Sequence, residues 1–292
     1  MKEIKGIKIS ENASLKNLNT YKLESHAKYL IRVETLEGLI DLLKYLKESN
    51  INYFILGAGS NIIIDEYFDG AVIKLDGLRK IEVKDNIITS EAGAMMGALS
   101  CTSMDNNLTG LEWAINIPGT VGGSIVGNAG AYKSEMFDSL VKIKVLDENL
   151  EIKELKKEEI KHTYRHTDLK GKNWIVLEAT FKLEKGNKEE SLELVKDRQE
   201  RRNKTQPLDM PSAGSVFRNP EGDHAGRLIE EAGLKGYQIG GASVSTKHAN
   251  FIVNTGNATS NDIKNLIELV HSQVKEKFNV DLVLEQEIID WK

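Results

Sequence analysis

Three stretches of this chain combine glycine with hydroxyl or amide side chains and carry very little charge. They run from Leu56 to Ile62, over residues 117–131, and from Pro211 to Pro220. Glycine lets a backbone approach a phosphate closely, and the exposed N–H groups of such a loop bind anions. A hydroxyl in a rigid, proline-bounded loop suits a proton donor or a phosphate contact. These residue types therefore point to a phosphate-bearing ligand and to proton transfer.

Each stretch also has a plainer interpretation, which the sequence leaves open. The first can be a tight turn between strands, and it is a poor Rossmann fingerprint because Ile62 stands where a third glycine is needed. The second can be a surface loop, but such loops usually carry more charge, so we favour a pyrophosphate-binding or ring-binding site there. The third, taken alone, is more simply a turn between two prolines.

Two histidines, His162 and His166, lie four residues apart, which is a zinc-like spacing if the segment is helical. No glutamate follows the first histidine and no third ligand is evident, so we expect no metal site. Tyr164 and Arg165 between them are of more interest, because an arginine can stabilise developing negative charge.

Two carboxylates, Glu285 and Glu287, lie close to the end of the chain. A strand is predicted over 282–289, and its period of two places both glutamates on one face with Val283 and Ile289. Burying a charge is costly unless it is paired, which suggests a functional acid. An edge strand with a solvated face is an equally good interpretation.

Hydrophobic periodicity places the first glycine-rich stretch in a small α+β unit, residues 1–79. Leu36, Leu39 and Leu43 have helical spacing, and Thr35 is a suitable N-cap for that helix. The predicted elements are a helix over 35–50 and strands over 53–56, 62–64 and 71–75.

A second unit, residues 80–204, contains the uncharged stretch, which we interpret as a loop-rich ligand cradle. The elements predicted around it are a hairpin over 81–89 turning at Asp85–Asn86, a helix over 94–106, strands over 141–146, 152–155 and 174–183, and a charged helix over 189–203.

Pro207 and Pro211 mark a break, after which residues 205–292 form a third unit. Its clearest element is a helix over 260–278 with one apolar stripe, which Ser260 or Asp262 can cap.

Composition bounds the class of protein. The 292 residues include 39 Lys and Arg against 44 Asp and Glu, a net charge of −5. This balance provides no global attraction to nucleic acid or to an anionic membrane, so neither is an expected partner. A single cysteine, Cys101, excludes a disulfide framework or a cysteine-rich zinc site within one chain. It also fits a reducing compartment.

Neither the N-terminal segment nor the uncharged region suggests targeting to a membrane. The first ten residues alternate charged and apolar types and lack the apolar core of a signal peptide. Residues 113–132 are long enough to span a bilayer, but five glycines and a proline would leave backbone groups unsatisfied in lipid. We therefore expect a cytoplasmic protein, and a monomer.

The order of the motifs is more specific than any one of them. Together they resemble the UDP-N-acetylenolpyruvoylglucosamine reductases (MurB) over nearly the whole chain. The short path from Arg165 to Gln206 is similar to the compact subtype that lacks the tyrosine loop. The motifs are Leu56-Gly-Ala-Gly-Ser-Asn, Gly110-Leu-Glu-Trp, Ile117-Pro-Gly-Thr-Val-Gly-Gly, Asn128-Ala-Gly-Ala-Tyr, Tyr164-Arg165, Gln206-Pro-Leu, Pro211-Ser-Ala-Gly-Ser-Val-Phe-Arg-Asn-Pro, Ala225-Gly-Arg-Leu-Ile-Glu, Gly233-Leu-Lys-Gly and His248-Ala-Asn-Phe.

The resemblance implies an α+β flavoenzyme. Its fold would be the two-subdomain FAD-binding fold of the vanillyl-alcohol-oxidase/PCMH type, with a C-terminal α+β substrate domain. FAD would be bound non-covalently by the two subdomains. The cofactor-binding residues carried over are Gly57, Ala58, Gly59, Ser60, Asn61, Gly119, Thr120, Gly122, Gly123, Asn128, Ala129, Gly130 and Ala131.

The implied reaction passes a hydride from NADPH, through the flavin, to C3 of the enolpyruvyl ether of a UDP-sugar, giving UDP-N-acetylmuramate for peptidoglycan synthesis and cell wall biogenesis. Negative charge then develops at C2 and on the carboxylate, and C2 must be protonated. The matching catalytic residues are Arg165, Ser215 and Glu287, with Glu285 as the rival acid. The matching substrate-binding residues are Arg218, Asn219, Arg227 and Lys235.

Two other functions remain open at this point. A flavin-dependent oxidase could share the fold, although Cys101 has no glycine-rich partner that would suggest covalent flavin attachment. A nucleotide-sugar-binding protein without flavin is the non-enzymatic alternative. Product analysis separates the first from a reductase, and the visible spectrum of the purified protein identifies the second.

Overall fold

The computed structural model describes residues 3–289 and Trp291. The chain forms two compact units: unit 1 contains residues 1–11, 29–58 and 70–199, and unit 2 contains residues 12–28, 59–69 and 200–292. The three-part division expected from the sequence divides the chain differently, since residues 12–28 and 59–69 of its first part belong to unit 2, and it stays a prediction. Its outer ends, residues 1, 2, 290 and 292, lie outside the described residues.

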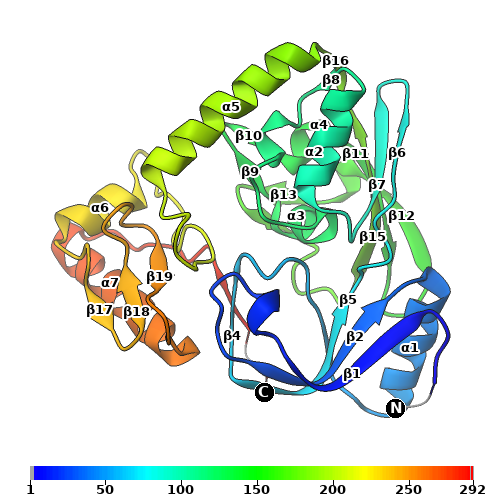
Figure 1. Ribbon diagram of the computed structural model, residues 1–292, viewed down its shortest axis with the longest axis horizontal. Helices are drawn as coiled ribbons and strands as arrows, with labels where there is room; N and C mark the ends of the chain where they lie inside the picture. The colour runs from blue at the N-terminus through cyan, green and yellow to red at the C-terminus, as the bar shows by residue number, and fades with distance from the viewer. Residues whose placement is uncertain (1–2, 290, 292) are drawn as a thin grey trace. The chain divides into compact units, whose positions relative to one another are not determined.

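The first part of unit 1 is built on a four-stranded sheet with the strand order β1-β2-β5-β3. The helix α1 (Leu36–Glu48) lies beside it (Figure 1) and buries Leu39, Leu42, Leu43 and Leu46. The Thr35 hydroxyl accepts a hydrogen bond from Gly38 N at 3.1 Å, as predicted for the N-cap. The strands are β1 (Ile7–Ser14), β2 (His26–Val33), β3 (Tyr53–Ile55) and β5 (Tyr67–Lys74).

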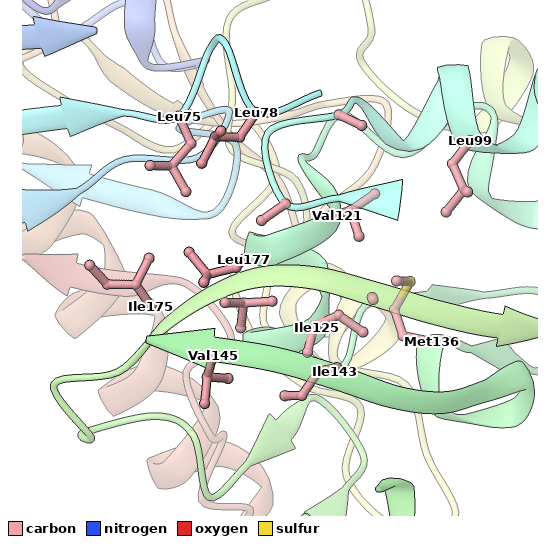
Figure 2. Packing of buried hydrophobic residues seen from close by; sticks show 14 of the residues in the cluster. Leu75, Leu78, Leu99, Val121, Ile125, Met136, Ile143, Val145, Ile175 and Leu177 are labelled. Carbon is pink, nitrogen blue, oxygen red and sulfur yellow. The ribbon is translucent and has the colours of Figure 1, made fainter. Parts of the chain in front are cut away.

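A five-stranded antiparallel sheet carries the rest of unit 1, in the order β12-β11-β15-β7-β6. Helices α2 (Met96–Asp105) and α3 (Val121–Gly127) contribute to the same core, and Figure 2 shows Val121 and Ile125 among buried side chains of β11 and β15. The predicted hairpin and strands are confirmed as β6 (Ile81–Lys84), β7 (Ile87–Glu91), β11 (Leu140–Leu146), β12 (Ile152–Lys156) and β15 (Ile175–Lys182).

Short elements complete unit 1 and the connection that leaves it. The predicted charged helix is α5 (Lys188–Thr205). The others are β8 (Leu108–Thr109), β9 (Gly130–Ala131), β10 (Ser134–Glu135), α4 (Met136–Ser139), β13 (His162–Thr163), β14 (His166–Thr167), β16 (Glu184–Lys185) and 3-10 turns at Glu112–Ala114 and Lys157–Glu159.

Unit 2 has its own core, in which α6 (Ala225–Glu231) and α7 (Ser260–Phe278) pack with a three-stranded sheet of order β17-β18-β19. Figure 1 shows α7 beside this sheet. The strand β20 (Glu287–Ile289) pairs in parallel with β4 (Ile62–Ile64), which brings the end of the chain next to the first glycine-rich stretch. The sheet strands are β17 (Gln238–Ile239), β18 (Ala242–Val244) and β19 (Ile252–Asn254), and a 3-10 turn lies at Lys16–Leu18.

Two expectations about these elements were wrong, and one was incomplete. The uncharged stretch, expected to be rich in loops, also contains the short helix α3, which the sequence did not predict and which buries Val121 and Ile125. The cap of α7 is Thr259, whose hydroxyl accepts from Asp262 N at 3.1 Å, and not Ser260 or Asp262. The strand predicted over 282–289 is interrupted by a bend at Gln286. Glu285 and Glu287 therefore do not lie on one face of a single regular strand, as the sequence predicted.

The mixture of helices and antiparallel sheets confirms the α+β class. Over the described ranges, no helix is both long enough and apolar enough to cross a bilayer.

Candidate functional site

The first glycine-rich stretch links β3 to β4, and its first half rests on a buried lysine. Lys74 Nζ, on β5, donates a hydrogen bond to the Gly57 carbonyl. Burial lowers the pKa of Lys74, while the nearby Asp76 carboxylate opposes that shift. A Cβ atom added at Gly57 would lie 2.9 Å from Thr120 Oγ1. In unit 1, therefore, the first stretch directly contacts the second.

The second half of this stretch is held by a segment that sequence reasoning did not select. Thr20 N donates to the Gly59 carbonyl at 3.0 Å. Gly59 has a φ of 66°, and a Cβ atom there would collide with the Leu18 carbonyl oxygen. Only glycine meets both conditions, because other residues rarely adopt this φ and all of them carry a Cβ atom.

The second stretch is fixed to the turn between β7 and α2 by backbone hydrogen bonds. Met96 N donates to the Gly119 carbonyl at 2.9 Å, and Gly122 N donates to the Ala92 carbonyl at 2.9 Å. A Cβ atom at Gly122 would lie 2.9 Å from that of Ala92. Gly122 is therefore required for packing within the protein, whatever else this stretch binds.

Asn128 ends α3 with a φ of 44° and is fully buried. Its Nδ2 donates to the Thr163 carbonyl at 3.0 Å. Its buried Oδ1 has no hydrogen-bond partner among the described residues. An unpartnered buried oxygen is costly, and a bound ligand that donates a hydrogen bond would remove that cost.

Arg165 lies against the same stretch. Its guanidinium donates to the carbonyls of Asn128, at 3.3 Å, and of Gly130. The φ of Arg165 is 57°, because it occupies the turn of the hairpin formed by β13 and β14. The structure therefore brings together Arg165 and the 128–131 segment, which the sequence placed in separate motifs.

The same hairpin removes the geometry that would make the two histidines a zinc pair. His162 and His166 lie on paired strands and not on one helix, and the His162 ring stacks on Phe137 at 4.2 Å. Within residues 3–289, no cluster of histidine, cysteine or acidic side chains has the arrangement of a metal site.

The third stretch lies in unit 2, where Asn250 holds it. Val216 N donates to the Asn250 carbonyl at 2.9 Å, and the Asn250 amide side chain exchanges hydrogen bonds with Phe217 N and O at 3.0 and 2.8 Å. Ser215 itself pairs with Phe251 through a β-bridge. In the described part of the chain, the Ser215 hydroxyl makes no hydrogen bond to another residue.

The acidic segment, residues 285–287, adjoins this loop within unit 2. Glu285 N donates to the Val216 carbonyl at 2.8 Å, and the Glu285 carbonyl accepts from Asn61 Nδ2 at 3.1 Å. Glu287 N donates to the Asn61 carbonyl at 2.9 Å. The end of the first stretch, the Ser215 loop and both glutamates are therefore neighbours in one hydrogen-bonded network.

The residues expected to bind substrate lie farther along unit 2, and several already have partners. Arg218 N donates to the Val283 carbonyl at 2.8 Å, and Asn219 Oδ1 accepts from Ala225 N at 3.1 Å. Lys235 pairs with Glu230 at 2.6 Å. The backbone of Arg218 and the side chains of Asn219 and Lys235 are thus placed by local structure.

Arg227, on α6, is bound by two carboxylates. It forms ion pairs with Asp223 and, at 2.8 Å, with Glu231. The hydrogen bond from Arg227 lowers the pKa of Asp223 to about 2. A diphosphate bound by this arginine would have to displace an existing ion pair.

Comparison with known proteins adds evidence on the whole chain. Residues 206–289 match the family model described as UDP-N-acetylenolpyruvoylglucosamine reductase, C-terminal domain, and residues 27–156 match the model described as FAD binding domain. A protein of Caldanaerobacter subterraneus subsp. tengcongensis named UDP-N-acetylenolpyruvoylglucosamine reductase is 47% identical over 100% of this chain and 97% of its own length.

The chain belongs to the UDP-N-acetylenolpyruvoylglucosamine reductase family. A relative of that name from Fusobacterium nucleatum subsp. nucleatum is 45% identical, covering 97% of this chain and 99% of its own. The solved structure of the reductase (MurB) from Thermus caldophilus has a TM-score of 0.82 and 33% identity, over 97% of this chain and 99% of that one. The resemblance read from the motifs, and the FAD-binding fold with its C-terminal domain, are confirmed.

The residues at the glycine-rich stretches suit the flavin dinucleotide that this family model describes. The 117–131 stretch is uncharged, and the buried Asn128 oxygen offers an acceptor to a donor group of a bound ligand. Nothing lies within 4 Å of a Cβ atom added at Gly127, so the backbone there is accessible. Backbone amides and small side chains of this kind can follow a pyrophosphate closely.

Proposed function

We propose that this protein is an FAD-dependent UDP-N-acetylmuramate dehydrogenase. It reduces UDP-N-acetylenolpyruvoylglucosamine to UDP-N-acetylmuramate with NADPH, in peptidoglycan precursor synthesis. The observation that carries this proposal is the 42–47% identity, over essentially the full chain, to proteins with this reductase name. The reaction is an oxidation–reduction that also requires a proton. The hydrogen bonds that join the Ser215 loop to Glu285 and Glu287 are consistent with a proton donor there.

FAD bound at this site would supply the hydride transfer from NADPH to C3 of the enolpyruvyl ether. The residues proposed to hold it non-covalently combine backbone amides, small side chains and two asparagines. They are Gly57, Ala58, Gly59, Ser60, Asn61, Gly119, Thr120, Gly122, Gly123, Asn128, Ala129, Gly130 and Ala131. At Gly59 and Gly122 the absence of a Cβ atom is also required by the protein's own packing.

Arg165 is proposed to stabilise the negative charge that develops on the substrate carboxylate after C3 is reduced. A guanidinium held by fixed acceptors loses little side-chain entropy when it meets an anion. The hydrogen bonds to the Asn128 and Gly130 carbonyls supply that fixation. Removing a preorganised group of this kind typically costs about a hundredfold or more in rate.

Ser215 is proposed to donate the proton to C2, through its Oγ. Glu287 is proposed as the second acid–base group, with Glu285 as the competing assignment. Both glutamates are linked through Asn61 and Val216 to the Ser215 loop. Proton transfer needs donor and acceptor within hydrogen-bond reach, so a loop held from both sides is favourable.

Arg218, Asn219, Arg227 and Lys235 are proposed to bind the UDP-sugar. Arginine and lysine are the side chains that recognise a diphosphate. We also propose that NADPH and the sugar nucleotide bind in turn at one site, and that the enzyme is a cytoplasmic monomer.

The visible spectrum of the purified protein tests the proposal. It should show flavin absorbance that bleaches on anaerobic addition of NADPH and returns when the enolpyruvyl substrate is added. A protein that stays colourless after reconstitution with FAD would instead be a flavin-free binding protein. Hydrogen peroxide formed from a hydroxylated substrate, without NADPH oxidation, would identify an oxidase.

A further inference from the structure

A chain of buried hydrogen bonds lies directly beneath the Ser215 loop in unit 2. Gln286 is 3% exposed, and Tyr21 is completely buried. The Tyr21 hydroxyl donates to Gln286 Oε1 at 2.9 Å. Gln286 Nε2 donates to the Ala213 and Gly214 carbonyls, both at 3.1 Å. Neither Tyr21 nor Gln286 was selected as a site residue from the sequence.

The chemistry of glutamine matches this position on both sides. Its amide offers one oxygen acceptor and two N–H donors, and here the oxygen meets a hydroxyl donor while the nitrogen meets two carbonyls. Burial raises the pKa of Tyr21, so its hydroxyl stays protonated and can donate. Every polar atom of the amide is therefore used, in a place where an unpaired one would be costly.

Gln286 lies at a position in the chain where its hydrogen bonds can affect the reaction. It stands between Glu285 and Glu287, and the two carbonyls that it binds belong to the residues just before Ser215. One side chain therefore connects the acidic segment to the serine loop. Tyr21 is itself anchored, because Asn254 Nδ2 donates to its carbonyl at 2.8 Å.

We propose that Gln286 and Tyr21 are positioning residues that fix the Ser215 loop relative to the acidic segment for proton donation to the substrate. This inference rests on the proposed function, and it deepens it by adding two residues that touch neither substrate nor cofactor. A shift of the donor by about 1 Å is enough to cost about a hundredfold in rate. Loss of the amide should therefore slow the protonation step without affecting NADPH oxidation.

The test uses Gln286→Met, which keeps the side-chain length and removes its hydrogen bonds, and the milder Tyr21→Phe. In anaerobic stopped-flow experiments, Gln286→Met should slow reoxidation of the reduced enzyme by the enolpyruvyl substrate about ten- to a hundredfold. Flavin reduction by NADPH and the Kd of the substrate should stay as in the wild type. Tyr21→Phe should also slow reoxidation and leave flavin reduction unchanged, but with a smaller loss of rate. It replaces Gln286→Met in the test if that variant does not fold.

The double variant adds a readout that general destabilisation would not produce. If the two residues act as one unit, Tyr21→Phe should cost nothing more in a Gln286→Met background. Ser260→Ala is the matched control, because it removes a hydrogen bond of 3.0 Å to Asp65 elsewhere in unit 2. That variant should leave both half-reactions unchanged. Equal losses in both half-reactions, or an unchanged oxidative half-reaction in Gln286→Met, would overturn the inference.

Hydrogen exchange separates this inference from the proposed function. In the flavin-free protein, Gln286→Met should raise amide exchange over residues 213–217 while α7 stays protected. If the wild type fails to reduce the enolpyruvyl substrate, the proposed function fails whatever the exchange shows. If the wild type turns over and the exchange over 213–217 does not change, the positioning role is refuted.

Discussion

At the scale of single residues, Ser215 is a weak acid for its proposed task. A hydroxyl is far from ionising at neutral pH, so its proton must move while charge develops on the substrate and cationic groups stabilise that charge. The loop around it supplies rigidity rather than acidity, because Asn250 holds the backbone of Val216 and Phe217, the two residues that follow it. Ser215 would therefore act by its position more than by its intrinsic pKa.

Replacing Ser215 by alanine should separate the two halves of the reaction. Ser215→Ala should slow substrate-dependent reoxidation about a hundred- to ten-thousandfold, since general acids typically contribute that much. Reduction by NADPH should survive, and stopped-flow absorbance of the flavin measures both steps. Ser212→Ala, which removes the other hydroxyl of the same loop, is the control and should behave as wild type. Equal loss of both steps in Ser215→Ala would exclude a proton-donor role.

Gly59 makes a residue-scale prediction about the first stretch. Gly59→Ala should lower the free energy of unfolding of the flavin-free protein by about 1–2 kcal/mol or more, because alanine is strained at positive φ. The added Cβ atom would also press on the Leu18 carbonyl. FAD affinity, measured by fluorescence titration of the same protein, should fall with it.

Gly127→Ala is the matched control for that change. Gly127 ends α3, and a Cβ atom there has open space around it. Helix propensity predicts a gain of up to about 0.5–1 kcal/mol, measured by urea unfolding. If the two alanine variants were equally stable, backbone conformation would not be the reason for glycine at position 59.

At the scale of elements, local signals located most of the scaffold. The helix α1 begins where Thr35 precedes an apolar stripe, and the hairpin of β6 and β7 turns at Asp85, whose φ is 55°. These features depend on neighbours in the sequence, so a sequence shows them. The start of α7 was harder, because Thr259, Ser260 and Asp262 are all good capping residues within one turn.

The features that sequence reasoning missed depend on partners far along the chain. Gln286 lies 265 residues from Tyr21, and the two meet only after folding. Local propensity also failed for α3, where burial of Val121 and Ile125 outweighed the low helix propensity of glycine. Elements were thus predictable from the sequence where the local pattern determines them. They were not predictable where packing between distant parts of the chain determines them.

The capping box of α7 predicts a stability change with no catalytic effect. Thr259→Ala removes the acceptor for Asp262 N, which should cost about 1 kcal/mol in the free energy of unfolding. Urea unfolding measures this change, and steady-state turnover of the folded variant should match the wild type. A loss of turnover at full folding would show that α7 does more than support unit 2.

His248 predicts how stability depends on pH near the Ser215 loop. Its Nδ1 accepts a hydrogen bond from Asn250 N at 3.2 Å, so only the neutral ring suits the fold. Burial lowers the pKa of His248 below its ordinary 6.5 and outweighs a backbone hydrogen bond that raises it, and the smaller effects of Lys235 and Glu230 oppose each other. In the window just below pH 6.5 the unfolded chain therefore binds more protons than the folded one, and stability falls as pH falls.

His248→Gln should remove that contribution while keeping a hydrogen-bond acceptor. The unfolding free energy of the wild type minus that of the variant should then rise as pH rises through this window and level off above 6.5. Urea unfolding at a series of pH values measures it. Parallel stability curves for the two proteins would show that folding does not shift the pKa of His248.

At the scale of the whole molecule, each unit carries part of the proposed chemistry. Unit 1 contains Arg165 with the uncharged stretch, and unit 2 contains Ser215 with the acidic segment. The first glycine-rich stretch crosses from one unit to the other between Ala58 and Gly59. The family assignment rests on the whole chain, since relatives match over 97–100% of its length.

The most direct test of the account is the product of a single incubation. Purified protein, NADPH and UDP-N-acetylenolpyruvoylglucosamine should yield UDP-N-acetylmuramate, detected by mass spectrometry as the substrate plus two hydrogen atoms. One NADPH should be oxidised for each product molecule formed. Recovery of unchanged substrate from a flavin-loaded protein that still oxidises NADPH would contradict the account.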